Sequence, residues 1–196
     1  LIQEEAHLLN FQINNIIIAA EIESGTLDLQ LTNVDFKDMI LQLKEDLKYP
    51  IRNKKSIMNI NILCENDFAY DREKDYRILI NLVSNAVEYS PFGTSIEIEI
   101  FEEVDDFKIL VKDYGEGISN DERDKIFNRF YQAHSGMNRA HRGQGLGLSV
   151  VQDLVNFLDG KIKFHSEINQ FTIFEITLPK LSKDSFPLKL WKRLFT

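Results

Sequence analysis

The stretch YRILINLVSNAVEYSP, residues Tyr76 to Pro91, decides the fold. At about 100° per residue its apolar side chains fill one continuous arc, as an amphipathic helix requires. Asn81, Asn85 and Glu88 fall together at the edge of that arc, because residues three and four apart share a helix face. Asparagine is a poor interior helix residue, so two of them one turn apart suggest an amide pair facing a ligand. If this helix stood alone, two solvent-exposed asparagines would be the better interpretation. The other motifs of the chain decide between solvent and a ligand.

Composition describes an ordinary soluble globular protein. The 196 residues are 43% hydrophobic and 28% charged, which suits one full domain with an appendage. The net charge of -8 argues against a nucleic-acid binder, so any polyphosphate site must rely on local cations and backbone amides. The single cysteine, Cys64, excludes an intrachain disulfide. No apolar run approaches the ~20 residues that span a bilayer. Because the chain opens without methionine, membrane segments are expected only upstream of Leu1.

Residues 1 to about 24 predict a helix of a bundle. Apolar residues recur there at four-three spacing, the seam of a coiled coil or helical bundle, namely Ile2, Ala6, Leu9, Ile13, Ile16 and Ala20. Further apolar residues widen this surface, so we expect more than two helices in the bundle. The alternative is a helix that packs on its own domain. Ser24-Gly25 ends the helix, with glycine just past the last periodic residue.

The remaining pattern predicts an α+β sandwich, because hairpins replace regular βαβ alternation. Asp35 and Asp71 are expected to cap helices, the first of which Pro50 would stop. The predicted helices are 36–49, 72–89, 121–127 and 146–158, and the predicted strands are 27–34, 58–62, 96–100, 107–112, 161–165 and 171–178. Residues 130–143 predict a long functional loop. The amphipathic tail, 182–196, suggests a docking helix, a linker or a membrane-surface contact.

Two glycine-rich segments accompany the central helix. Asp113-Tyr-Gly-Glu-Gly-Ile118 follows a predicted strand. An aspartate there can accept a hydrogen bond from an exocyclic amine, and glycines let the backbone approach a flat ligand; a glycine-rich turn with an Asx cap is the alternative. Arg142-Gly-Gln-Gly-Leu-Gly-Leu148 opens the next helix, whose free N–H groups make a phosphate cradle. It is neither a P-loop nor a dinucleotide fingerprint, because it lacks Gly-Lys-Ser/Thr and a βαβ unit.

In this order and spacing, the segments resemble the catalytic and ATP-binding domain of sensor histidine kinases, within the ATPases of the Bergerat fold. NLVSNAVEYSP matches the family's N box, DYGEGI the first glycine box, IFNRFYQ the phenylalanine box and RGQGLGLSVV the second glycine box. The resemblance runs from about residue 1 to 180. It implies a two-layer α/β sandwich with a mixed sheet covered on one face by helices. The implied division is a bundle helix at 1–25, a catalytic domain at 26–181 and a tail or linker at 182–196.

The resemblance also implies a site for ATP and Mg²⁺. Asn85 would coordinate Mg²⁺ through its amide oxygen, with Asn81 as a second metal ligand beside it. Asp113 would bind the adenine amino group, and the loop 130–142 would be the ATP lid. The full implied set of ATP-binding residues is Asn81, Asn85, Tyr89, Asp113, Gly115, Gly117, Ile118, Arg142, Gly143, Gln144, Gly145, Leu146, Gly147 and Leu148.

Three positions refine the implied chemistry. Glu88 stands where many members carry a basic residue, so it faces away, pairs with a lid arginine or acts through the metal. Gln132 likewise replaces a basic residue that often ends the phenylalanine box. Hydrolytic relatives place a glutamate one turn before the metal-binding asparagine. That position is Asn81 here, which cannot act as a general base, so phosphoryl transfer is expected instead of hydrolysis.

The implied function is transfer of the γ-phosphoryl group of MgATP to a histidine on the dimerisation bundle of a homodimer, for relay to a response regulator receiver domain. None of His7, His134, His141 and His165 has the phosphoacceptor context. The acceptor is therefore expected upstream of Leu1, and no catalytic residue is assigned within these residues. The alternatives are a protein-serine kinase of the anti-sigma type and a nucleotide-sensing module without transfer. The implied location is cytoplasmic, in a membrane-anchored bacterial receptor that has no nucleic-acid partner.

Overall fold

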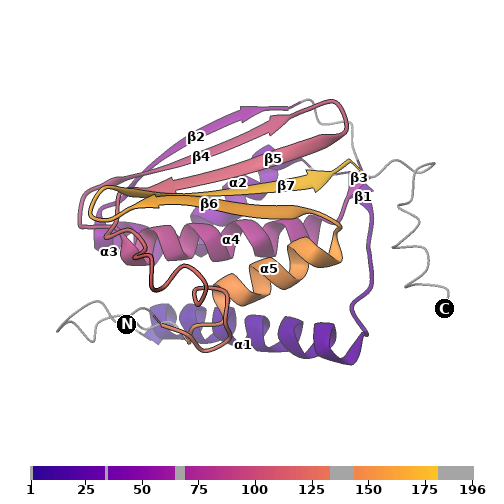
Figure 1. The fold of residues 1–196 in the computed structure, drawn as a ribbon, viewed down its shortest axis with the longest axis horizontal. Coiled ribbons are helices and arrows are strands. Elements are labelled where there is room, and N and C mark those ends of the chain that lie inside the picture. Colours follow the sequence, from indigo (N-terminus) through magenta and orange to yellow (C-terminus); the bar gives the residue numbers. More distant parts are fainter. Residues whose placement is uncertain (1, 34, 65–68, 133–143, 181–196) are drawn as a thin grey trace.

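The computed structural model describes residues 2–33, 35–64, 69–132 and 144–180, which form a sheet with helices stacked beneath it (Figure 1). The helices are α1 (Ile2–Ser24), α2 (Phe36–Asp46), α3 (Lys48–Lys54), α4 (Arg72–Tyr89) and α5 (Gly147–Phe157). The strands are β1 (Thr32–Asn33), β2 (Ile57–Leu63), β3 (Ala69–Tyr70), β4 (Ser95–Glu102), β5 (Asp106–Asp113), β6 (Lys161–Glu167) and β7 (Phe171–Pro179).

The main sheet is mixed, with strand order β2-β4-β5-β7-β6. β2 pairs with β4 in parallel, and the other neighbours in this sheet are antiparallel. Ile96, Ile98 and Ile100 of β4 are fully buried, whereas Glu97 and Glu99 alternate with them and point to the opposite face. The sheet therefore has one face against the helices and one face open, which confirms the predicted α+β class.

The central helix, α4, lies beside α5 under the sheet (Figure 1). The Asp71 carboxylate caps it by accepting a hydrogen bond from Lys74 N at 3.1 Å, and the helix ends at Tyr89, before Ser90 and Pro91. Ile78 and Val83 are fully buried on the apolar arc that the sequence predicts. This packing fixes the polar edge of α4 relative to the sheet.

Helix α1 forms a further layer beneath α4 and α5 (Figure 1). Ile18 and Ala19 are buried against the domain, whereas Leu9, Ile13, Ile16 and Ile17 on other sides of the helix are 44–56% exposed. The predicted helix is confirmed. One side of it packs on its own domain, and it also presents an exposed apolar side. Within the described residues, no helix is both long enough and apolar enough to cross a membrane.

Two predicted boundaries are wrong at the start of the domain. The helix expected at 36–49 breaks at Leu47, and Pro50 lies in the first turn of α3, where its missing N–H is not needed. The strand expected at 27–34 is reduced to Thr32–Asn33. Gln30 N donates to Asp71 Oδ2 at 2.8 Å, so this backbone is held by the cap of α4 and not by a strand.

The segment expected as a helix at 121–127 is a series of hydrogen-bonded turns. Lys125 N and Ile126 N both donate to Glu122 O, at 2.8 and 3.1 Å, so the bonding pattern does not settle into a helix. The other predicted helices and strands are present with small shifts at their ends. Most of the predicted lid, 133–143, and the tail, 182–196, lie outside the described residues.

Candidate functional site

A cavity of about 90 Å³ lies between α4, the end of β5 and the start of α5, and we call it the small cavity. Asp113 reaches it from β5, Asn85 and Tyr89 from α4, and Leu148 from α5. Its other walls are Glu116, Gly117, Ile118, Glu122, Ile126, Tyr131, Thr172 and Phe174. Of the three carboxylates in these walls, those of Asp113, Glu116 and Glu122, only Asp113 is buried. A buried carboxylate beside apolar and aromatic walls makes this cavity suited to a flat ligand that carries an N–H donor.

Asp113 is the buried charged group of the small cavity. It is 6% exposed, and its Oδ1 accepts a hydrogen bond from Gly115 N at 2.9 Å. Burial raises the pKa of the Asp113 carboxyl to about 6, against the lowering effect of the Gly115 bond. At neutral pH the group is therefore an ionised acceptor in a dry site, where an amine donor would stabilise its charge.

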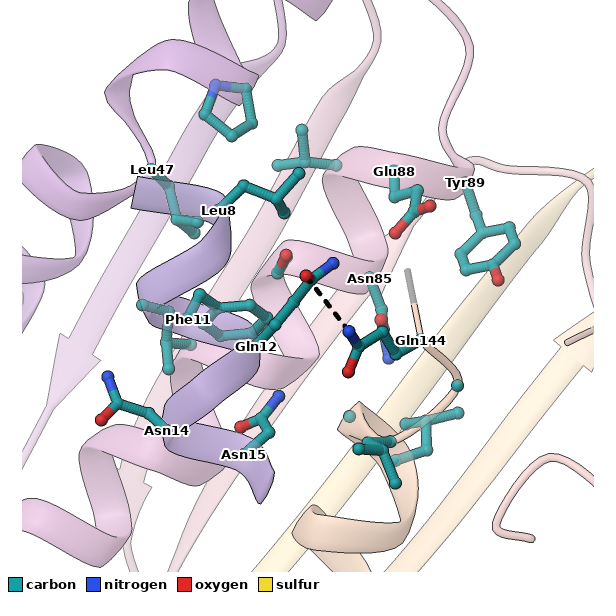
Figure 2. A pocket seen from close by; sticks show the side chains of 18 of the residues that line it. Leu8, Phe11, Gln12, Asn14, Asn15, Leu47, Asn85, Glu88, Tyr89 and Gln144 are labelled. Atoms are coloured by element: carbon teal, nitrogen blue, oxygen red, sulfur yellow. Dashed lines mark hydrogen bonds between the residues drawn. The ribbon is translucent and has the colours of Figure 1, made fainter. Parts of the chain in front are cut away.

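A second cavity of about 480 Å³, the large cavity, is shown in Figure 2, and its walls in part are those of the first. The two share the walls Asn85, Tyr89, Ile126, Tyr131 and Leu148. Residues 144–147, at the start of α5, line the large cavity from one side, and α1 lines it from another. A ligand that fills the small cavity with a flat group can thus extend into the large one toward the positive end of α5.

The start of α5 approaches the amides of α4 closely. A Cβ atom on Gly147 would lie 3.0 Å from Asn81 Oδ1 and 3.6 Å from Asn85 Oδ1. Gly145 has φ +69°, and a Cβ there would lie 2.5 Å from Tyr131 O, so glycine is required at this turn. The backbone at the start of α5 is thereby held beside the side-chain amides of Asn81 and Asn85.

This donor set fits a metal that takes most of its ligands from phosphate and water. The Asn85 amide oxygen lies near a helix N-terminus and lines both cavities, and Mg²⁺ prefers such oxygen ligands while keeping several waters and phosphate oxygens. Among the described residues, no group of three His, Cys, Asp or Glu side chains could hold a metal ion. A metal here would therefore depend on an anionic ligand in the large cavity.

Asn81 differs from Asn85 in its surroundings. It is 1% exposed and lines neither cavity. Asn15 of α1 donates from Nδ2 to Asn81 Oδ1 at 2.8 Å, and Asn81 Nδ2 donates back to Asn15 Oδ1 at 3.1 Å. The structure thus pairs Asn81 with α1, and its assignment as a metal ligand stays a prediction.

The remaining predicted residues lie in three places. Gly117 and Ile118 line the small cavity, while Gly115 lines neither cavity; a Cβ on Gly115 would meet Tyr89 O at 2.6 Å. Glu88, one departure from the family pattern, lines the large cavity. Five predicted residues at the start of α5 line the large cavity, namely Gln144, Gly145, Leu146, Gly147 and Leu148. Arg142 and Gly143 lie outside the described residues.

Sequence reasoning missed the contribution of α1 to this site. Phe11, Gln12 and Asn15 line the large cavity (Figure 2), and Gln144 Nε2 donates to Gln12 Oε1 at 3.3 Å. The available signal was Asn15, a polar residue between the apolar residues Phe11 and Ile18 on one side of the helix.

Tyr89 of α4 is also affected by burial, which raises the pKa of its phenol to about 12. The Tyr89 hydroxyl therefore stays protonated at neutral pH.

Comparison with known proteins gives one family for this arrangement. Residues 70–182 match the family model of the histidine kinase-, DNA gyrase B- and HSP90-like ATPases. The chain is 34% identical over 184 residues, 88% of its length, to the autoinducer 2 sensor kinase/phosphatase LuxQ of Vibrio parahaemolyticus. It is 29% identical over 177 residues, 89% of its length, to the circadian input-output histidine kinase CikA of Synechococcus elongatus. The chain spans 21% and 23% of these two relatives.

Solved structures share the fold. The histidine kinase AdeS of Acinetobacter baumannii aligns with a TM-score of 0.74 at 21% identity, over 92% of this chain and 82% of that protein. Full-length ShkA in complex with AMPPNP aligns with a TM-score of 0.76 at 22% identity, over 91% of this chain and 37% of that protein. The family match over residues 70–182, together with curated relatives that are sensor or histidine kinases, leads to one conclusion: the chain belongs to the histidine kinase-, DNA gyrase B- and HSP90-like ATPases, as a catalytic domain of the sensor histidine kinase type.

Proposed function

We propose that this chain binds MgATP and presents its γ-phosphoryl group for transfer to a histidine on a dimerisation bundle. The observation that carries the proposal is the pair of adjoining cavities. One has the buried Asp113 carboxylate among its walls, and the other has the glycine-rich start of α5 beside the Asn85 amide. An adenine base and a polyphosphate need these two environments side by side.

Each group has a defined part in binding. The Asp113 carboxylate accepts a hydrogen bond from the adenine amino group, and Tyr89 lines both cavities. Backbone N–H groups at the start of α5, with Gln144, hold the phosphates, joined by Arg142 and Gly143 from the lid. Asn85 offers its amide oxygen to Mg²⁺, which neutralises phosphate charge when it is bound.

The chemistry favours transfer over hydrolysis. The residue one turn before Asn85 is Asn81, an amide that cannot take a proton from water and that is buried against α1. Water near the phosphates therefore has no general base at this position. Catalysis depends on positioning a histidine acceptor and on neutralising charge.

The wider organisation is part of the same proposal. Residues 1–25 belong to the dimerisation bundle, 26–181 form the catalytic domain, and 182–196 are a tail or linker. The exposed apolar residues of α1, Leu9, Ile13, Ile16 and Ile17, pack against the other helices of that bundle in a homodimer. The phosphorylated histidine serves a response regulator receiver domain, and the whole is the cytoplasmic part of a membrane-anchored receptor.

Two measurements test the function in sequence. Calorimetric titration of ATP, with and without Mg²⁺, is expected to show binding that Asp113→Asn weakens, while Asp159→Asn, an exposed change after α5, leaves it unchanged. Radiolabelled ATP is then added with a bundle polypeptide that carries the acceptor histidine. An acid-labile, alkali-stable label on the bundle supports the kinase. Binding without any label would instead identify a nucleotide-sensing module.

A further inference from the structure

Helix α1 meets the nucleotide site through a polar residue set in an apolar side. The side of α1 that packs on the domain carries Phe11, Asn15, Ile18 and Ile22, of which Asn15 is 4% exposed. Its neighbour Ile16 is 48% exposed on another side of the helix. An asparagine in such a contact fixes one register of packing, because its amide must find a partner.

The partner of Asn15 is the N-box residue Asn81, and the pairing leaves Asn81 little freedom. Each amide donates to the other, at 2.8 and 3.1 Å, and Asn81 Nδ2 also donates to Arg77 O at 2.8 Å. Both N–H groups of the Asn81 amide are therefore used. Turning the Asn81 oxygen toward the large cavity requires the Asn15 bonds to break.

Two further contacts join α1 to other motifs around the cavities. Gln12 accepts a hydrogen bond from Gln144 at the start of the phosphate cradle, at 3.3 Å, as Figure 2 shows. Glu23 forms an ion pair with Arg129 of the phenylalanine box, which also contacts Asp153 of α5 at 3.1 Å. Along one helix, α1 thus holds one residue from each of three motifs.

Each of these three residues carries a group that can bind a metal or a phosphate, and of the three only Gln144 lines a cavity in this position of α1. Asn81 offers an amide oxygen, Gln144 an N–H donor and Arg129 a positive charge. With α1 docked, the first two are hydrogen-bonded to the helix, and the charge of Arg129 is balanced by Glu23 and Asp153. While α1 is docked, these groups are therefore less available to a ligand.

We propose that α1 in this position is a built-in competitor of MgATP, with the Asn15–Asn81 amide pair as its central contact. The inference rests on the proposed function, namely that the cavities bind MgATP. Binding of nucleotide releases Asn81 and loosens α1, and docking of α1 weakens nucleotide binding by the same factor, because coupling between two binding events is reciprocal. Asn15 is thus a positioning residue that acts on the site through Asn81.

The first test compares two alanine variants of α1 that differ in the side they change. Asn15→Ala removes the pair with Asn81, whereas Ile16→Ala, one residue further on, changes an exposed side chain. The affinity for the magnesium complex of AMPPNP is measured by calorimetry, and folding is checked by circular dichroism. Asn15→Ala is expected to bind about fivefold tighter or more, and Ile16→Ala to bind like the wild type. An equal or weaker affinity of folded Asn15→Ala overturns the inference.

The second test needs no variant and applies even if Asn15→Ala does not fold. Hydrogen exchange of the α1 backbone is followed in the wild-type chain, with and without saturating Mg–AMPPNP. Nucleotide is expected to speed exchange in α1, because a helix without packing is marginal in water. Unchanged or slower exchange contradicts the competition. If neither wild type nor Asn15→Ala binds at millimolar nucleotide, the proposed function fails as well; if both bind equally, only this inference fails.

Discussion

Gly147 lies against Asn81 so closely that a Cβ atom on the glycine would be 3.0 Å from the Asn81 amide oxygen. The first turn of α5 can approach the polar edge of α4 only because this position has no side chain. The glycine-rich start of α5 and the amides of α4 are thus fitted to each other at one contact.

Gly147→Ala is expected to weaken nucleotide binding. The added methyl pushes on the amides of Asn81 and Asn85, and because Gly147 is the first residue of α5, the preference of alanine over glycine in a helix interior, about 1 kcal/mol, is not fully gained. We expect about a tenfold loss of affinity, or ~1.4 kcal/mol, with a lowered melting temperature. Asn156→Ala, an exposed change near the other end of α5, is the matched control. Equal nucleotide affinities of the two variants would contradict phosphate binding at the start of α5.

The affinity for ATP is expected to rise with pH through the titration of Asp113. Its carboxyl has a pKa of about 6 in the free protein because it is buried, and an amine donor in the small cavity favours the ionised form. Binding therefore lowers this pKa and releases protons near pH 6. Affinity should increase from pH 5 to 7 and then level off, and Asp113→Asn should flatten the profile. Calorimetry in buffers of different ionisation enthalpy measures the proton release.

Asp75 is expected to cost stability at neutral pH. It is 1% exposed, and its Oδ2 atom has no hydrogen-bond partner among the described groups. Burial raises the pKa of its carboxyl well above the usual value, and nearby Asp71 raises it further, against the lowering effect of Lys74. A raised folded-state pKa stabilises the fold at low pH, and this stabilisation is lost as pH rises from the unfolded-state value toward the folded one.

Asp75→Asn should therefore be more stable than the wild type at pH 8, by about 1–3 kcal/mol, and the difference should shrink toward pH 4. Urea unfolding at the two pH values measures it. Asp38→Asn, an exposed acid in the first turn of α2, tests whether any loss of charge has the same effect. A difference that does not depend on pH would rule out the titration of Asp75 as its cause.

Lys54 is expected to stabilise the end of α4. Its Nζ donates to Glu88 O at 2.8 Å and to Ser90 O at 3.0 Å, carbonyls at a helix end that have no partner within the helix. Lys54→Met keeps the aliphatic stem and removes both bonds, so we expect a loss of about 1–2 kcal/mol in the free energy of unfolding. Lys37→Met, at an exposed position of α2, is the control. Urea denaturation at neutral pH compares the two.

Local signals predicted most of the fold because each has a local cause. The caps at Asp35 and Asp71 satisfy backbone N–H groups of the helices that they begin, and alternation in β4 follows from one buried face. The predicted end of the helix at residue 49 was wrong because a proline can follow the end of one helix or lie in the first turn of the next. The segment 27–31 has strand composition, but its hydrogen bond to the cap of α4 depends on tertiary structure.

The site was predictable only in part for the same reason. Asp113 and the glycines of α5 stand in recognisable motifs, so the sequence could name them before their cavities were seen. The contact of Asn15 with Asn81 joins residues far apart in the chain, and no periodicity within α1 specifies which amide it meets. A buried polar residue on a helix indicates that a hydrogen-bond partner exists, but only the tertiary packing shows which residue that partner is.

Helix α1 is a rod of 23 residues, about 34 Å long at ~1.5 Å per residue, with apolar side chains on more than one side. Successive residues are about 100° apart around its axis, so a twist of that size would bring Ile16 opposite Asn81 in place of Asn15. An isoleucine offers no hydrogen bond, and the stranded amide would cost about 1–3 kcal/mol. The nucleotide site is thereby sensitive to the angular setting of a helix whose other sides face away from it.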